Sequence, residues 1–292
     1  MEDRGTIMDS VALVRYCGDL EETLKRAISL IGGFGVLKSP VVIKPNICAQ
    51  VDETGVANTK VEMVEALIKM ILKEDEDISI RIVESDSESK YADEAFEKFG
   101  YKSIEERFRR RGVDVSLVNL SRSPTVKVEL DGLYFENPEL PKLLTESRYF
   151  ISIAVAKTHN LTLITGALKN LFGLLPRKDQ SFYHPHINEV IIDLNGFIRP
   201  DLCIIDAIVG LEGVLRGRPR RVNTLIVGRK PVSVDATVAR VMGFEPERIR
   251  HLVGAERQHL GSIHPKVLGE SLESTAVEFK PPANLRPTAL IN

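Results

Sequence analysis

Several polar residues of this sequence follow directly after short apolar segments, where they could bind a ligand or move a proton. In chain order they are Lys44, Asn46, Glu84, Asp86, Lys157, His159 and Asp206. If the apolar segments are parallel strands, their carboxyl ends meet at one edge of a sheet, where open α/β sheets bind ligands. Alternatively, polar residues end these strands because loops meet water. The recurrence of the pattern favours a shared site.

The stretch KTHNLTLITGALKNLFGLLP (157–176) predicts a helix over 162–175 with two unlike faces. At 100° per residue, one face holds leucine and isoleucine side chains. The other face holds Thr162, Gly166, Lys169 and Gly173. Glycine costs about 1 kcal/mol in a helix interior, so something must approach this face closely. We expect an anion at the helix N-terminus, in contact with Lys169; helix packing through the glycines is the alternative.

Two histidines, His184 and His186, flank Pro185 in the segment SFYHPHINEV. They could share a metal ion with His159, although no carboxylate stands at a diagnostic spacing. Alternatively, His184 begins a helix with Pro185 in its first turn, and one histidine transfers a proton or contacts an anion. We expect the Pro185 turn to make His184 and His186 point apart, so that the three imidazoles do not bind one ion.

The segment DAIVGLEGVLRGRPRRVN (206–223) is rich in glycine and arginine and is predicted to be a loop. Its glycines permit unusual backbone angles, and its arginines can donate to an anion. The residues are Gly210, Gly213, Gly217, Arg216, Arg218, Arg220 and Arg221. The sequence leaves open whether 210–217 is a lid, a phosphate-contacting loop or a solvated basic loop.

Composition restricts the class of protein. The formal net charge of −2 argues against a dedicated nucleic-acid binder. The longest apolar runs, such as 149–156, are far shorter than the roughly 20 residues that span a bilayer. The N-terminal MEDRGTIMDS lacks the apolar segment of a secretory signal, so we expect no membrane partner and a cytoplasmic location. The three cysteines show no CxxC spacing, and GxGxxG, GxxxxGK[ST] and GxSxG are missing.

Strand-like and helix-like segments alternate over most of the 292 residues, which predicts a single α/β domain over 1–292 with a mainly parallel central sheet flanked by helices. A β-rich insertion is expected over 113–145, with a turn at Asp131-Gly132. The expected strands lie at 11–16, 41–44, 78–83, 149–156, 202–205, 223–227 and 275–279. The expected helices, besides 162–175, lie at 20–31, 60–72, 92–111, 187–198, 234–242 and 246–260.

Five segments in this order closely resemble the domain of unknown function 362 family: VVIKPNI, AKTHNLTLITGALKNLFGLLP, FYHPHI, LCIIDAIVGLEG and PVSVDATVARVMGFEP. The resemblance extends over about residues 10–262. The family has no settled activity, and many members carry an appended ferredoxin-like segment with two 4Fe–4S clusters. This chain lacks the cysteines of that segment. The resemblance therefore implies a stand-alone member without an intrinsic iron–sulfur cluster, whose redox partner would be a separate ferredoxin-like protein.

Carried over residue by residue, the family pattern implies a site made of matching positions. They are Lys44, Pro45, Asn46, Lys157, His159, Lys169, Asn170, Gly173, His184, Asp206, Glu212, Gly213 and Asp235. One departure concerns the segment after Gly213, where relatives often show Gly-Pro and this chain has Val214 and Leu215. More remotely, the layout is similar to that of lactate racemase-like proteins, which use a nickel-bearing organic cofactor.

The leading prediction is an enzyme that acts on a small anionic metabolite or anionic cofactor, with a redox-linked subclass implied by the relatives. Lys44, Lys157 and Lys169 would hold the anion. His159 or His184 would transfer a proton, and Asp206 or Asp235 would orient it or bind a metal. Further expected ligand-binding residues are Asn46, Asp86, Thr162, Gly166, Asn170, Glu212 and Gly213. The alternative is a non-catalytic accessory protein that binds a cofactor or metal. An RNA-binding module, based on the arginine clusters alone, ranks below both.

Overall fold

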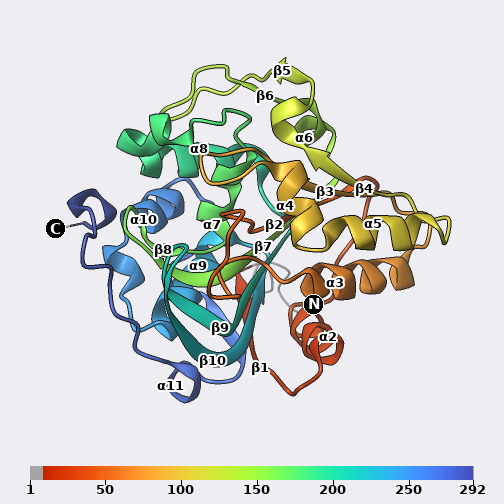
Figure 1. Cartoon of the computed structure of the whole chain (residues 1–292). Coiled ribbons are helices and arrows are strands. Elements are labelled where there is room, and N and C mark those ends of the chain that lie inside the picture. The colour runs from red at the N-terminus through yellow and green to blue at the C-terminus, as the bar shows by residue number, and fades with distance from the viewer. Residues whose placement is uncertain (1–8, 292) are drawn as a thin grey trace, which may run out of the picture.

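The computed structural model describes residues 9–291. The expected absence of a secretory signal concerns residues 1–10, and of these residues 1–8 lie outside the described range, as does residue 292. A nine-stranded sheet forms the centre of the described chain (Figure 1). In spatial order its strands are β11 (Lys266–Gly269), β1 (Ser10–Arg15), β10 (Gly217–Gly228), β9 (Leu202–Gly213), β7 (Tyr149–His159), β2 (Val41–Pro45), β3 (Ile80–Glu84) and β4 (Val115–Asn119). The short strand β8 (Leu163–Thr165) pairs with β7 outside this path.

Most neighbouring strands of the sheet run parallel, which confirms the predicted fold class. Parallel pairs join β9 to β7, β7 to β2, β2 to β3 and β3 to β4, and a further one joins β1 to β11. β10 is antiparallel to both β9 and β1. β9 and β10 can run antiparallel because a short turn connects them, whereas parallel neighbours need long crossovers.

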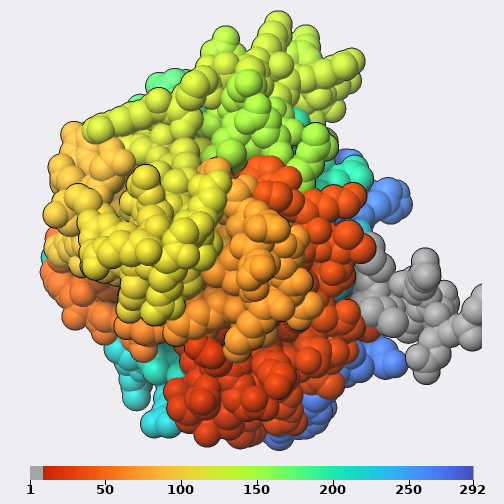
Figure 2. Space-filling model, turned by 90° about the vertical axis from the view of Figure 1, so that its right-hand side faces the viewer, coloured from red at the N-terminus to blue at the C-terminus, as the bar shows by residue number. Residues whose placement is uncertain are grey.

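Helices cover both faces of the sheet, and each face has its own apolar core. In β1, Val11 and Leu13 belong to one core and Ala12 and Val14 to the other, as the period of two along a strand requires. The face of Ala12 is covered by α2 (Leu20–Leu30), α3 (Val61–Glu74), α4 (Ala92–Lys98) and α5 (Tyr101–Arg109) (Figure 2). The opposite face is covered by α7 (Ala167–Asn170), α8 (Ile187–Ile198), α9 (Pro231–Val241) and α10 (Arg250–Arg257).

Local sequence signals explain the helices that the sequence predicted well. The Asp19 side chain accepts a hydrogen bond from the N–H of Glu22 and so caps α2. Leu24, Ala27 and Ile28 then recur at helical spacing and are buried against the sheet. The remaining helical segments are α6 (Lys142–Glu146), α11 (Leu272–Thr275) and the 3-10 turns η1 (Leu120–Arg122), η2 (Leu171–Leu174), η3 (Gln180–His186), η4 (Pro246–Arg248) and η5 (Pro287–Ala289).

The β-rich segment predicted over 113–145 is divided between two sheets. β4 lies parallel to β3 at the edge of the main sheet. Only β5 (Thr125–Lys127) and β6 (Glu139–Pro141) form a separate two-stranded antiparallel sheet, which lies at the top of the molecule in Figure 1. The smaller β-containing part is therefore shorter than the predicted insertion, because the first of its strands completes the parallel order.

The helix predicted over 162–175 is wrong in its first half. Residues Leu163–Thr165 form β8, which pairs antiparallel with the end of β7. Only then does α7 begin, and it continues as the 3-10 helix η2. The β-branched side chains of Thr162, Ile164 and Thr165 favour an extended backbone, and this preference outweighs the helical spacing of the leucines.

The predicted loop over 206–223 is also wrong, because most of it belongs to the β9–β10 hairpin. Its glycines lie within the strands or beside the turn at 214–216. Gly213 and Gly217 have φ angles of 144° and 149°, a conformation that favours glycine. The strand expected at 275–279 does not form either, since Ser271 caps α11 over the preceding residues. Within residues 9–291, no helix is both long enough and apolar enough to cross a membrane.

Candidate functional site

A cavity of about 370 Å³ lies at the carboxyl ends of β2, β3 and β7. The parallel registers bring these strand ends to one edge of the sheet. We call this space the lysine cavity, after Lys44, Lys90, Lys157 and Lys169 in its wall. The predicted site residues that line it are Lys44, Asn46, Lys157, His159, Lys169, Asn170, Gly173 and His184.

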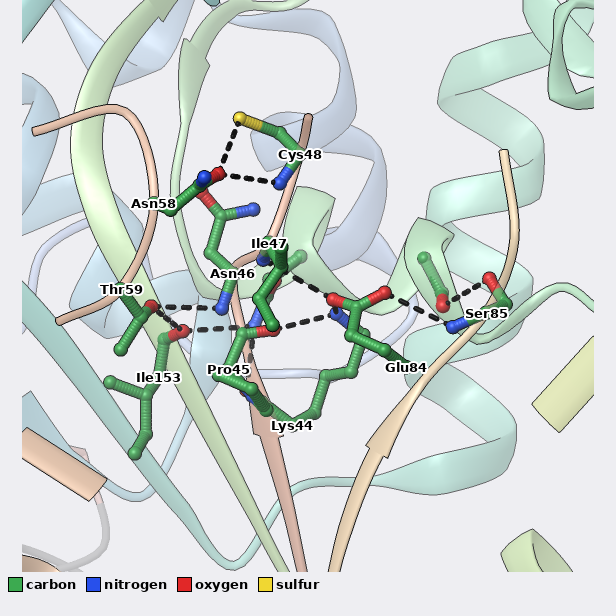
Figure 3. A network of polar contacts seen from close by, with 12 residues as sticks. Lys44, Pro45, Asn46, Ile47, Cys48, Asn58, Thr59, Glu84, Ser85 and Ile153 are labelled. Atoms are coloured by element: carbon green, nitrogen blue, oxygen red, sulfur yellow. Dashed lines mark hydrogen bonds and ion pairs between the residues drawn. The ribbon is translucent and has the colours of Figure 1, made fainter. Parts of the chain in front are cut away.

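Lys44 and Lys90 share the carboxylate of Glu84 at the bottom of the cavity. The Lys44 ammonium forms an ion pair with Oε1 of Glu84 (Figure 3). Lys90 Nζ lies 3.0 Å from Oε2, and all three side chains are almost completely buried. Burial lowers the pKa of Lys44, and the neighbouring Glu84 opposes that shift. One carboxylate thus compensates two buried ammonium groups.

Lys157 has only neutral partners. Its ammonium group donates to the carbonyl of Ala57 at 2.6 Å and to Sγ of Cys48 at 3.2 Å. The side chain is 1% exposed, so its charge is held at the cavity wall. β7 positions Lys157 because this strand is longer than β2, its parallel neighbour, and extends beyond it.

Lys169 faces the cavity without a hydrogen bond or ion pair to any residue of the described chain. It projects from α7, and its Nζ lies 4.4 Å from the centroid of the Phe172 ring. This cation–π contact holds the ammonium group without neutralising it. Burial and the nearby Lys157 lower the pKa of Lys169 to about 8. Among the cavity lysines, Lys169 is therefore the one best placed to gain a new anionic partner.

The two cavity histidines are uncharged at neutral pH. Burial, Lys169 and Lys157 lower the pKa of His159 well below its usual value. Its Nδ1 accepts a hydrogen bond from the N–H of Leu161 at 3.1 Å, which leaves Nε2 to carry the proton. His184 stacks on Phe172 with 6.1 Å between ring centroids. Burial and Lys169 lower the pKa of His184 as well.

Asn170 ties the cavity wall together. Its amide nitrogen donates to the carbonyls of Lys44 and Ile153 and to the hydroxyl of Ser152, at 3.0–3.3 Å. These acceptors fix the orientation of the amide, because a carbonyl oxygen could not replace the nitrogen there. Asn170 thus joins α7 to β2 and β7. Asn170 therefore positions the backbone of Lys44, and its contacts in the described chain serve the fold.

Asp235 lies beneath α7 and outside the lysine cavity. Its carboxylate accepts hydrogen bonds from the N–H groups of Ala167 and Leu168, at 2.6 and 3.0 Å. The anion expected at the start of the predicted helix is therefore a side chain of the protein itself. Gly166 is small because the Asp235 carboxylate occupies the space that a Cβ atom would need. The expectation that a ligand fills this space is wrong.

The remaining predicted site residues have partners elsewhere in the fold. Asp86 accepts from the N–H of Ala92 at the start of α4, and Asp206 from the N–H of Ile208 beside a register shift of β9. Glu212 pairs with Arg220 at 3.0 Å in the hairpin. Thr162 donates to the carbonyl of Ile164, and Gly213 adjoins the hairpin turn. None of these five residues lines the lysine cavity.

Sequence reasoning missed Lys90 and Cys48 as parts of the site. It singles out Glu84 at the end of its strand but predicts Asp86, not Glu84, as a ligand-binding residue. The position of Glu84 at the last residue of β3 was a usable signal, because it is the polar group nearest the strand end. Lys90 and Cys48 lie in loops, and nothing in their local sequence shows that they meet Glu84 and Lys157 in space.

The expected separation of the histidines agrees with the structure. His159 and His184 line the lysine cavity, whereas the His186 ring lies 5.3 Å from that of Tyr134. Across residues 9–291, no three side chains of the His, Cys, Asp and Glu types are grouped so as to hold a metal ion.

The sequence of this chain matches a known protein family. The sequence profile of a domain of unknown function (DUF362) matches residues 41–240, which include every lysine of the cavity. This chain belongs to the DUF362 family. The membership predicted from the sequence is thereby confirmed, and the family description names no reaction.

Two known proteins resemble this DUF362 member. The thylakoid-associated protein sll1697 of Synechocystis sp. is 24% identical over 268 residues, which cover 86% of this chain and 80% of the relative. The lactate racemase apoprotein of Thermoanaerobacterium thermosaccharolyticum is similar in structure, with a TM-score of 0.44 and 14% identity. That similarity covers 78% of this chain, and the chain spans 56% of the racemase.

Proposed function

We propose that this protein is an enzyme that binds a small anionic metabolite or anionic cofactor in the lysine cavity and transfers a proton within it. The observation that carries the proposal is the unpaired ammonium group of Lys169, which faces the cavity beside Lys157. Glu84 is already shared by Lys44 and Lys90. A carboxylate or phosphate group would supply the missing negative charge.

The histidines would have different roles in this reaction. His159 would donate a hydrogen bond through Nε2–H, because its Nδ1 is occupied by Leu161. His184 is held uncharged by burial and by Lys169, so at neutral pH it is available as a proton acceptor. The neighbouring ammonium groups of Lys157 and Lys169 would stabilise negative charge that develops on the ligand when its proton leaves.

Thermal unfolding in sulfate tests the anion-binding part of the proposal. Sulfate should raise the melting temperature of the wild type, since a ligand at a hundredfold excess over Kd stabilises by about 2.7 kcal/mol. Lys169→Met should lose most of that shift. Lys127 is exposed on β5, away from the cavity, so Lys127→Met should keep the shift. Equal shifts in the Lys169→Met and Lys127→Met proteins would exclude Lys169 from the anion site.

Native mass spectrometry of the purified protein, followed by proton exchange, tests the catalytic part. We expect an organic anion to co-purify and to exchange a carbon-bound proton for deuterium in D₂O. His184→Gln should keep the anion bound and stop the exchange, because it removes the proton acceptor. Exchange at the wild-type rate in His184→Gln would contradict this role of His184.

The alternative function is a non-catalytic accessory protein, and the same experiments distinguish it. Such a protein would retain an anionic cofactor or a stoichiometric metal ion and would show no deuterium exchange. Two further predictions come from the sequence and the family resemblance. One is a redox-linked reaction with a separate ferredoxin-like partner, and the other is a cytoplasmic location. Fractionation of cells into membranes and cytosol tests the location, which matters because the curated relative is named thylakoid-associated.

A further inference from the structure

A second hollow of about 500 Å³ adjoins the lysine cavity. It lies between the turn of the β9–β10 hairpin and residues 49–53, a segment that follows β2. Ser89, Val214 and Leu215 line both spaces. We call this second space the apolar groove.

The walls of the apolar groove differ in character from those of the lysine cavity. Ala49, Val51, Val214 and Leu215 supply most of them. Val51 is 57% exposed. Hairpin turns normally carry Gly, Asn, Asp or Ser, whereas this turn places two branched apolar side chains together beside the cavity mouth.

An ion pair borders the apolar groove on the solvent side. Arg216 lies 2.8 Å from Glu53, so the hairpin turn is joined to the segment that follows β2. Both side chains are more than half exposed. The charge of this pair is internally balanced, so it offers no attraction to a second anion. The groove thus presents apolar walls next to the lysine cavity and a neutral polar rim.

We propose that the ligand is amphiphilic: its anionic head lies in the lysine cavity and its alkyl tail lies in the apolar groove. This inference rests on the proposed function, because the unpaired Lys169 and the neutral-partnered Lys157 are what hold the head. The position of the tail is inferred from adjacency, since three residues line both the charged space and the apolar one. Burial of alkyl groups against Val51 and Leu215 removes apolar surface from water.

Calorimetric titration with methyl, butyl and octyl phosphate tests this substrate class. The three probes carry the same head and differ only in the tail. Affinity should rise about fourfold for each methylene group that enters the groove, until the tail reaches solvent. Binding of all three phosphates with the same Kd would overturn the proposal.

Two asparagine variants show where the tail binds. Val51→Asn puts a polar, uncharged side chain into a part of the groove wall that does not line the lysine cavity, so butyl and octyl phosphate should lose part of their advantage while methyl phosphate keeps its affinity. Val36→Asn is the matched control, because Val36 is 77% exposed near the amino end of β2, away from the groove. An equal dependence on tail length in both variants would place the tail elsewhere and overturn the proposal.

The results separate the two proposals. Binding of inorganic phosphate without a dependence on tail length would contradict the amphiphilic ligand and leave the anion site intact. Lack of any binding by inorganic and methyl phosphate, together with unchanged binding of octyl phosphate in Lys169→Met, would contradict the anion site itself. The expected pattern is that Lys169→Met weakens the binding of all phosphates, whereas Val51→Asn weakens only the binding of those with long tails.

Discussion

The carboxylate of Asp235 lies against the backbone of Gly166 and fills the space of an absent Cβ atom. This contact fixes the start of α7, because the same carboxylate accepts from the N–H groups of Ala167 and Leu168. α7 in turn carries Lys169 toward the lysine cavity. A buried glycine–carboxylate contact outside the cavity thus sets the position of the ammonium group on which the proposed anion binding depends.

Gly166→Ala should lower the free energy of unfolding by about 1–3 kcal/mol, because a methyl group is forced into filled space. Gly196→Ala in α8 is the control: nothing lies within 4 Å of the added Cβ, so helix propensity should raise stability by up to about 1 kcal/mol. Urea unfolding measures both. A Gly166→Ala protein as stable as Gly196→Ala would show that Asp235 moves aside without cost.

Asp235 should make stability fall as the pH rises from about 4 to 7. Burial raises its pKa from 3.8 to about 7, so in this window the folded state binds a proton that the unfolded state has released. The loss is on the order of 4 kcal/mol, from about 1.4 kcal/mol per pKa unit. The difference in stability between wild type and Asp235→Asn, measured across this range, isolates the effect. A difference that grows with pH would mean that the two N–H bonds outweigh burial.

Sulfate affinity should fall as the pH rises through the pKa of Lys169. That pKa is about 8 in the free protein, and a bound anion raises it, so the loss continues above pH 8. Sulfate does not titrate in this range, so the protein alone sets the profile. Calorimetry between pH 6 and 10 measures it, and Lys169→Met should give a flatter curve. The same decline in both proteins would assign the titration to another group.

Glu84→Gln should destabilise the protein by about 3–5 kcal/mol, because it leaves Lys44 and Lys90 buried without a carboxylate. Adding Lys90→Met should recover part of that loss, since one of the two unpaired charges is removed. Urea unfolding of the single and double variants gives the coupling energy. Strictly additive losses would show that the two side chains do not interact energetically.

The sequence was sufficient for the fold class and for part of the cavity. Lys44 and Lys157 could be assigned to one sheet edge because each follows an apolar strand, and strands of this kind are parallel and buried. Lys169 is also a predicted site residue, although the helix predicted to carry it is longer than α7. The β7–β8 hairpin reverses the direction of the chain before α7 begins, and this reversal places Lys169 in the cavity wall.

The sequence could not predict which buried groups form hydrogen bonds or ion pairs with one another. Asp235 lies within a segment of helical pattern, as many surface residues do, yet it is completely buried against α7. Glu84 and Lys90 are six positions apart, and only the fold of the intervening turn makes them an ion pair. The stretch that follows Asp206 has the composition of a loop, but its glycines allow two long strands to pair closely. In each case the outcome depends on contacts between distant segments.

The pairing of β1 has a consequence for how the chain matures during translation. Of the described strands, β1 is synthesised before all the others, but its neighbours are β10 and β11, which follow about 200 and 250 residues later. At 5–20 residues per second, β1 waits roughly 10 to 40 s for β10. During that interval its apolar residues are not buried and both of its edges are unpaired. Unpaired strand edges of this kind favour aggregation. β2, β3 and β4, by contrast, follow one another within a short span and can assemble while the chain is still growing. The sheet can therefore assemble from its β4 edge toward β1, and β1 has no partner strand until the β9–β10 hairpin emerges.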